Sequence, residues 1–228
     1  MNFIFDSFKN SILLILSLDG EVYHAVWTSL YTSVTSITVA TAIGVPFALA
    51  LAVSDFPFKR LFIIFLNTLM ALPTVVVGLA LYGLLSRQGP GGSLGLLFTP
   101  SAMIIGQSIL ALPIVANYAL GTIKGADSRI IPTALTLGAS NSQAYILILS
   151  ETRFGIMAAV IAGFGRVIAE VGVAMMLGGN IRGYTRTMTT AIALETSKGE
   201  FAFGLALGII LMAVALLINL FLNIVQQK

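Results

Sequence analysis

The chain has 228 residues, of which 57% are hydrophobic and only 9% charged, and its mean hydropathy is +1.00. A soluble domain carries roughly 25% charged residues, so this composition excludes a protein whose whole surface faces water. The net charge of +3 is not gathered into a basic patch, which argues against nucleic-acid binding. The chain has no cysteine, which excludes disulfides and thiolate metal sites.

The first 24 residues contain an apolar stretch, SILLILSL, that is too short to cross a bilayer. Acidic and basic residues share the start of the chain and no small-residue cleavage site follows, which argues against a signal peptide. We therefore expect an interfacial helix here. His24, the only histidine, lies beside Tyr23 and Trp27, as in the aromatic belt at a membrane surface.

Four later runs have no charged residue and exceed the ~20 residues that a helix needs to cross a bilayer. With an apolar segment in the second half, they predict spans at about residues 26–53, 61–86, 101–123, 154–177 and 202–225. Pro46, Pro73 and Pro113 fall inside spans, where proline kinks a helix. The fold expected is an all-α polytopic membrane protein with five transmembrane helices and a single domain over residues 1–228.

Five spans place the two termini on opposite sides of the membrane. Basic residues in short loops favour the cytoplasmic side. With the N-terminus outside, the inner loops and tail carry six of them (Lys59, Arg60, Lys124, Arg129, Arg153, Lys228) and the outer segments five (Lys9, Arg87, Arg182, Arg186, Lys198). This small difference predicts the N-terminus outside and the C-terminus in the cytoplasm.

A mildly polar segment at residues 124–153 separates two of these spans. Apolar residues recur at helical spacing over residues 130–137, and Pro132 suits a first helical turn. Gly138 suits the end of that helix, and Ser140 suits the cap of a second one. The pattern predicts a stiff helical hairpin that fits a partner's groove and transmits force, or a plain amphipathic connector.

Two charged residues, Arg166 and Glu170, lie four apart within the fourth predicted span and therefore share a helix face. Each charge near the bilayer centre costs about 2.5–3.5 kcal/mol, so we expect the pair to point into the bundle or a water-filled path. A structural ion pair and a gate or path lining both remain open. A strong anion site is not expected, because Glu170 offsets the charge of Arg166.

Polar residues gather again after the fourth span, at residues 178–200. Hydroxyl, amide and guanidinium groups suit a tetrahedral oxyanion, which accepts many hydrogen bonds. An ordinary solvated loop and a docking surface for an external protein are the alternatives. The candidates for a translocation path or gate are therefore Arg166, Glu170, Asn180, Thr185, Arg186 and Thr187.

The stretch PTALTLGASNSQAYILILSETRFGI resembles the EAA loop of ABC-transporter permeases. Pro132, Thr133 and Ala134 stand at the Glu-Ala-Ala positions, Gly138 matches the motif glycine, and Ile148 matches its isoleucine. Ser150 and Glu151 replace the motif's Leu-Pro, and the acidic first residue is missing. The resemblance implies a coupling helix that contacts an ATPase through Pro132, Thr133, Ala134, Leu137, Gly138, Ala139 and Ser140.

Two further segments are similar to permeases of the molybdate and tungstate group, most of all the tungstate type. They are LPTVVVGLALYGLLSRQGPGGSLG, from Leu72, and GRVIAEVGVAMMLGGNIRGYTRTMTTAI, from Gly165. The resemblance implies a type I ABC importer permease fold in a prokaryotic cell membrane. It also implies a homodimer, cytoplasmic ATPase subunits and an extracytoplasmic substrate-binding protein, with no cofactor or metal. Molybdate and sulfate are the alternative substrates.

The chain contains no G-x-x-x-x-G-K-[ST] phosphate-binding loop. Any use of ATP therefore needs a separate subunit, and the chain itself is expected to be no enzyme. A stand-alone secondary transporter or channel is the alternative of another class, but five spans do not divide into the two repeats common in such carriers. With one histidine and no cysteine, a hydrolase is disfavoured.

Overall fold

The computed structural model describes residues 2–226, and every regular element in that range is a helix. The expected all-α architecture is confirmed for these residues. The helices are α1 (Asn2–Leu16), α2 (Gly20–Val53), α3 (Lys59–Met70), α4 (Thr74–Leu85), the 3-10 turn η1 (Gly92–Leu94), α5 (Pro100–Gly125), α6 (Ile130–Thr136), α7 (Asn141–Glu151), α8 (Arg153–Ile168), α9 (Gly172–Gly178), α10 (Met188–Lys198) and α11 (Phe201–Gln226).

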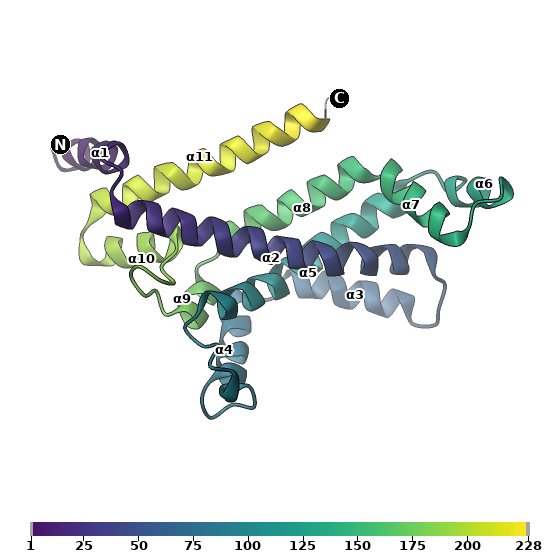
Figure 1. Ribbon diagram of the computed structural model, residues 1–228, viewed down its shortest axis with the longest axis horizontal. Coiled ribbons are helices and arrows are strands. Elements are labelled where there is room, and N and C mark those ends of the chain that lie inside the picture. The colour runs from purple at the N-terminus through teal and green to yellow at the C-terminus, as the bar shows by residue number, and fades with distance from the viewer. Residues whose placement is uncertain (1, 227–228) are drawn as a thin grey trace.

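Figure 1 shows an elongated bundle in which α2, α3, α5, α8 and α11 run along the long axis. The short helices gather away from the middle of this bundle. Helices α1 and α10 lie toward one end, and the α6–α7 hairpin lies at the other. Helix α4 projects to one side beside α9. The two ends of the bundle therefore carry different short helices.

Within the residues that the structure describes, three helices are long and apolar enough to cross a membrane, namely α2, α5 and α11. The number rises to five if each of two bent helix pairs counts as one span. The predicted second span, residues 61–86, is wrong as a single helix, because α3 and α4 meet at a bend of 97°. Pro73 lies at this bend rather than inside a helix, because a proline disfavours helical backbone at the residue before it.

The predicted fourth span, residues 154–177, is also wrong as a single helix. Helix α8 ends at Ile168, and the short α9 begins only after a break at residues 169–171. The helix that forms a bent apolar pair with α8 is α7, at 67°. The polar segment predicted at residues 124–153 is thus narrower than expected, because α5 runs on to Gly125 and α7 belongs to the bent pair.

The N-terminal region contains two helices rather than one helix over residues 1–24. Helix α1 packs against α11, and α2 begins at Gly20, where the Asp19 carboxylate accepts hydrogen bonds from the first turn. At 34 residues, α2 is about 51 Å long and exceeds the hydrocarbon thickness. Its first turns, with His24 and the exposed Trp27, therefore have room to lie at the membrane surface.

Helix α2 packs along α5 through small residues, and this contact forms the centre of the bundle. Gly44 sits against the backbone of α5, where an added Cβ would lie 3.4 Å from Ala116 N. Small residues let helix backbones approach closely in membranes. Buried polar groups also join the two helices, since Ser36 Oγ donates to Gln107 Oε1 at 3.1 Å. Helix α5 also packs against α3 and α8, so one helix of each bent pair contacts this centre.

Candidate coupling and translocation sites

The hairpin of α6 and α7 has the local structure that its sequence predicts. Pro132 lies in the first turn of α6. Backbone N–H groups in a first turn have no partner within the helix, so a proline there loses no hydrogen bond. Gly138 follows α6 with a positive φ of 88°, the left-handed conformation that glycine adopts without steric cost. Ser140 caps α7 in a capping box with Gln143. These terminal signals hold the two short helices at a fixed angle.

Helix α6 presents an apolar surface at the tip of the hairpin. The side chain of Leu137 is 83% exposed, and Leu135 is exposed as well, whereas Ala134 is buried against the rest of the chain. A shallow hollow of about 420 Å³ adjoins this tip, lined by Asp127, Arg129, Ile130, Thr133, Ala134, Leu137, Leu147 and Glu151. An exposed leucine beside a hollow with charged rims is typical of a protein-binding surface.

An ion pair precedes α6. The Arg129 guanidinium donates to both carboxylate oxygens of Asp127, with Nε at 3.0 Å from Oδ1 and Nη2 at 2.7 Å from Oδ2. The Asp127 carboxylate also accepts a hydrogen bond from the Arg129 backbone N–H. These bonds favour the charged form and hold the pKa of Asp127 below its ordinary value. The pair is solvent-exposed, so it fixes the loop geometry more than it stabilises the fold.

Arg166 and Glu170 are brought together as the sequence predicts, at the break between α8 and α9. Arg166 Nη1 donates to Glu170 Oε2 at 2.9 Å. The Glu170 side chain is 3% exposed, whereas that of Arg166 is 43% exposed. The other carboxylate oxygen, Oε1, accepts the Val173 backbone N–H at 3.2 Å, at the start of α9. Both carboxylate oxygens of Glu170 therefore accept hydrogen bonds, whereas part of the Arg166 guanidinium is exposed and its other N–H groups remain available.

The break between α3 and α4 lies against the break between α8 and α9. An added Cβ on Gly172, the first residue of α9, would lie 2.9 Å from Thr74 Oγ1, at the start of α4, and 3.3 Å from Glu170 Oε1. Only glycine permits this approach without a shift of its neighbours. Non-helical backbone at membrane depth is tolerated where it is buried in protein or lines a water-filled cavity. The two breaks are thus packed against each other within the protein.

The threonines of residues 178–200 mainly build local structure. Thr185 is completely buried, and its hydroxyl donates to Gly178 O and accepts from Ile181 N. Thr187 caps α10 in a capping box with Thr190. Their hydroxyls are already used within the chain. The expected loop is wrong over residues 188–198, which form α10, a helix anchored to α2 by the bond from Met188 N to Ser29 Oγ.

The same segment connects to the break. Thr189 Oγ1 donates to the Glu170 carbonyl at 2.8 Å, so the α9–α10 connection is tied to the end of α8. Asn180, whose φ is 51°, donates from Nδ2 to Thr190 O, and its Oδ1 is buried without a hydrogen-bond partner. The structure thus brings Glu170, Asn180, Thr185 and Thr187 into one connected region.

Arg186 belongs to a separate cluster, which we name the charged basin. Its hollow of about 350 Å³ is lined by Glu21, Arg182, Arg186, Glu195, Lys198, Glu200 and Phe203. Glu195 accepts hydrogen bonds from Arg186 at 3.3 Å and Lys198 at 3.1 Å, and Arg182 pairs with Glu21. Three cations face three carboxylates, so the basin attracts an anion only weakly overall. Arg186 Nε is nevertheless buried without a partner.

Three further residues make contacts that the sequence analysis does not predict. Glu195 folds back from α10 onto Arg186, and the side chains of Asn67 and Asn117 meet between α3 and α5. The signal for the two asparagines was present in the sequence, because each interrupts a charge-free apolar run with an amide. The signal for Glu195 was absent, because nothing in the spacing of residues 186 and 195 requires contact.

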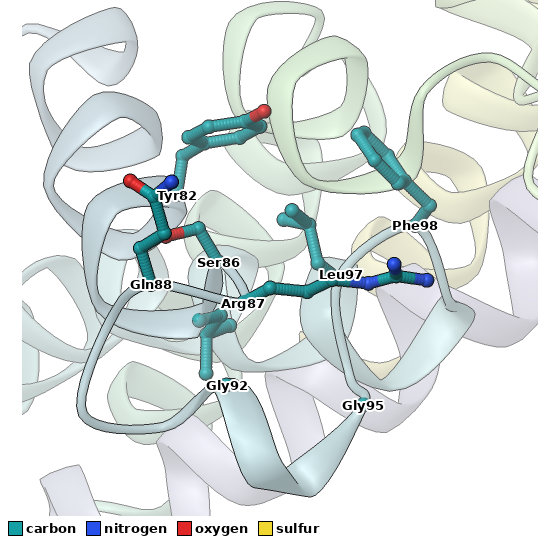
Figure 2. A pocket seen from close by; sticks show the side chains of 9 residues that line it. Tyr82, Ser86, Arg87, Gln88, Gly92, Gly95, Leu97 and Phe98 are labelled. Atoms are coloured by element: carbon teal, nitrogen blue, oxygen red, sulfur yellow. The ribbon is translucent and has the colours of Figure 1, made fainter.

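A further hollow, of about 600 Å³, lies at the far end of α4 and the η1 turn. Figure 2 shows the side chain of Arg87 extending across it toward Phe98, with Tyr82 and Gln88 on another side. Its polar lining residues are mostly exposed, and the Arg87 guanidinium forms no ion pair within residues 2–226. The hollow is an open polar surface rather than an enclosed binding site.

The coupling candidates and the path candidates occupy different parts of the bundle. Figure 1 places the α6–α7 hairpin at one end of the long axis, while α9 and the start of α10 lie toward the other. Helix α8 leads from the hairpin toward the break, since α7 meets it at Arg153 and Arg166 stands in its last turn. One rigid helix thus connects the exposed hairpin to the Arg166–Glu170 pair.

Curated relatives resemble the chain along its whole length. A tungstate uptake system permease protein TupB from Peptoclostridium acidaminophilum is 37% identical over all 228 residues of both chains. One from Campylobacter jejuni is 42% identical, covering 96% of this chain and 92% of its own. A probable anion ABC transporter permease protein from Haloferax volcanii is 40% identical over 84% of each. Relatives at 27–28% identity include molybdenum and sulfate transport system permease proteins.

A solved structure of the inward-facing MetNI methionine ABC transporter matches the fold with a TM-score of 0.74. It covers 92% of this chain and 96% of the matched chain, at 16% identity, so this likeness concerns the fold alone. No protein-family model matches the chain. The full-length relatives and the shared fold agree with each other, and the chain therefore belongs to the ABC transporter permease family that includes the tungstate uptake permeases.

Proposed function

We propose that the chain is the membrane-spanning subunit of an ATP-driven importer for tungstate. The observation that carries this proposal is the full-length identity of 37–42% to two permeases named for tungstate uptake. In the proposed importer, two copies of the chain stand side by side in the lipid bilayer of a prokaryotic cell. Separate ATPase subunits hydrolyse ATP in the cytoplasm, and an external binding protein delivers the anion. The chain itself carries out no chemistry.

The α6–α7 hairpin is the proposed contact with the ATPase. Its exposed Leu137 and the adjoining hollow supply the apolar centre and charged rim of a docking surface. A hairpin fixed by Pro132, Gly138 and Ser140 moves as a unit, so a shift of the ATPase reaches α7 and then α8. This assignment places the hairpin and the C-terminus in the cytoplasm and the N-terminus outside.

The break between α8 and α9 is the proposed moving part of the route. Helix α8 leads from the hairpin to Arg166, and the Glu170 carboxylate ties the end of α8 to the start of α9. The partly exposed Arg166 guanidinium retains donors for a passing oxyanion. Because Glu170 offsets its charge, that contact is weak enough to release the anion. Asn180, Thr185 and Thr187 position this region rather than bind the anion.

Uptake by the assembled importer tests the proposal. The chain is co-expressed with a partner ATPase and an external binding protein, and the complex is reconstituted in vesicles. We expect ATP-dependent accumulation of tungstate that excess molybdate inhibits less than excess tungstate, and that sulfate inhibits least. If molybdate or sulfate inhibited uptake more strongly than tungstate, that anion would be the preferred substrate instead of tungstate. Uptake by the chain alone in ATP-free vesicles under an ion gradient would instead indicate a secondary transporter.

The charged basin gives a further prediction. Arg186→Ala leaves the basin with excess negative charge, so the arriving anion is repelled. We expect ATP-driven uptake at low ionic strength to fall about tenfold, and the loss to shrink at high salt, where exposed charges are screened. The measurement is the initial uptake rate at two salt concentrations. Arg186→Lys is the matched control and keeps most activity. An equal loss at both salt concentrations would show a purely structural role.

A further inference from the structure

Two asparagines from different helices form an amide pair inside the apolar part of the bundle. Asn117 Nδ2, on α5, donates to Asn67 Oδ1, on α3, at 2.5 Å, and also contacts Met70 Sδ at 2.7 Å. Their sequence neighbours Leu66 and Ala116 are 3% and 0% exposed and belong to a hydrophobic cluster. The amides therefore lie at the edge of a packed core. One side of the pair contacts the hydrophobic cluster, and the other side is exposed at the surface of the chain.

The amide pair lies at membrane depth. Asn67 is eight residues from Lys59, the start of α3, and Asn117 is eight residues from Gly125, the end of α5. At 1.5 Å per residue, both lie about 12 Å from these helix ends. A hydrocarbon layer about 30 Å thick has its midplane only a few ångströms deeper. With these two helix ends, which carry Lys59 and Lys124, taken as the membrane surface, the pair lies well inside the layer.

Half of the hydrogen-bonding capacity of the pair is unused. Asn67 Nδ2 and Asn117 Oδ1 form no hydrogen bond within the part of the chain that the structure describes, and Asn67 is exposed. An amide carries two donors and an acceptor, and leaving them unpaired in hydrocarbon is costly. Polar side chains in membrane spans accordingly face the bundle or a water-filled cavity. This flank of α3 and α5 therefore faces water or protein, not lipid.

We propose that Asn67 and Asn117 line the water-filled route between two copies of the chain and that the free amide donors of Asn67 contact the passing oxyanion. This proposal rests on the proposed function as an anion importer. A neutral amide can donate hydrogen bonds to the anion without adding a positive charge that would hold it. Such a contact replaces part of the anion's hydration in the middle of the membrane and still lets the anion leave.

Cysteine accessibility tests the water-filled position directly, because the chain contains no cysteine of its own. Asn67→Cys and Asn117→Cys are made singly in the complete transporter and treated with the charged, membrane-impermeant reagent methanethiosulfonate ethylsulfonate. A thiol in water ionises and reacts, whereas a thiol in lipid stays protonated. We expect both positions to react about tenfold or more faster than a lipid-facing control, and millimolar tungstate to slow the reaction.

Two control positions calibrate the labelling. Leu216→Cys lies on the exposed side of the charge-free helix α11, and Phe65→Cys lies on the opposite flank of α3 from Asn67. Reaction of Asn67→Cys and Asn117→Cys no faster than Leu216→Cys would overturn the proposal and leave the pair as a bond between two helices. Fast reaction that tungstate does not slow would overturn the anion contact.

Transport separates this contact from the proposed function as a whole. We expect Asn67→Leu to reduce tungstate uptake about tenfold, while Asn67→Gln, which restores an amide, keeps most of it. Normal uptake by Asn67→Leu overturns the contact. Absence of ATP-dependent tungstate uptake by the unmodified transporter overturns the proposed function instead. If Asn67→Leu fails to assemble, the labelling of Asn67→Cys still decides where the side chain lies.

Discussion

Replacement of Gly138 by valine is expected to reduce coupled uptake about tenfold while the partner ATPase continues to hydrolyse ATP. Gly138 ends α6 with a φ of 88°, and this turn carries the bonds Gly138 N to Leu135 O and Ala139 N to Ala134 O. A side chain in the left-handed region costs about 1–2 kcal/mol, and more for a β-branched residue. Valine therefore favours a different turn and a misaligned hairpin. A cost of about 1.4 kcal/mol corresponds to a factor of ten, which gives the expected tenfold loss of coupled uptake.

The control for this prediction is Gly138→Asn. An added Cβ at Gly138 would meet no atom within 4 Å, so lost space cannot explain a defect. Asparagine adopts left-handed backbone more readily than other side chains and is found at helix ends for that reason. Both variants are compared by the ratio of anion transported to ATP hydrolysed. Equal ratios for valine and asparagine would contradict a role for the backbone conformation of the hairpin.

Replacement of Glu170 by alanine is expected to destabilise the chain by about 2–3 kcal/mol and to abolish most transport. The change removes the carboxylate that pairs with Arg166 and caps α9 through Val173 N. Breaking a buried ion pair costs about 3–5 kcal/mol when it leaves a buried charge unpaired. The cost here is smaller, because the side chain of Arg166 is 43% exposed and partly solvated. Thermal unfolding in detergent measures this loss.

A double-mutant cycle separates the ion pair from the cap. We expect Arg166→Ala with Glu170→Ala to recover part of the stability lost in Glu170→Ala, because no unpaired cation remains. Glu170→Gln keeps an oxygen for Val173 N but not the charge, so it retains the fold better than alanine does. If the stability lost in the double variant equalled the sum of the losses in Arg166→Ala and Glu170→Ala, the two side chains would not be energetically coupled.

Several features of the candidate sites followed from local sequence signals. Pro132, Gly138 and Ser140 each act within a few residues of their own position, through a missing N–H, a permitted φ and a side-chain cap. The prediction of two short helices was therefore confirmed. The meeting of Arg166 and Glu170 was also predictable, because residues four apart on a helix are neighbours regardless of what surrounds them.

The breaks within the spans could not be read from hydropathy. Residues 61–86 contain no charged residue, and most of α8 with α9 is apolar, so hydropathy predicts one helix for each segment. Glu170 caps α9 only because the chain breaks beside it, and its carbonyl finds Thr189, nineteen residues later. The threonine hydroxyls looked free for an anion in the sequence, but Thr185 and Thr187 are used by neighbouring backbone once the segment folds.

By itself, the sequence determined that the chain resides in a membrane, that it is helical, and that a hairpin of two short capped helices, α6 and α7, follows one apolar helix. These properties depend on composition and on contacts between near neighbours along the chain. Only the tertiary structure decided that two spans are bent, that Glu195 meets Arg186, and that Asn67 meets Asn117 across fifty residues. Contacts of this kind depend on how helices pack against one another, and no local pattern specifies that packing.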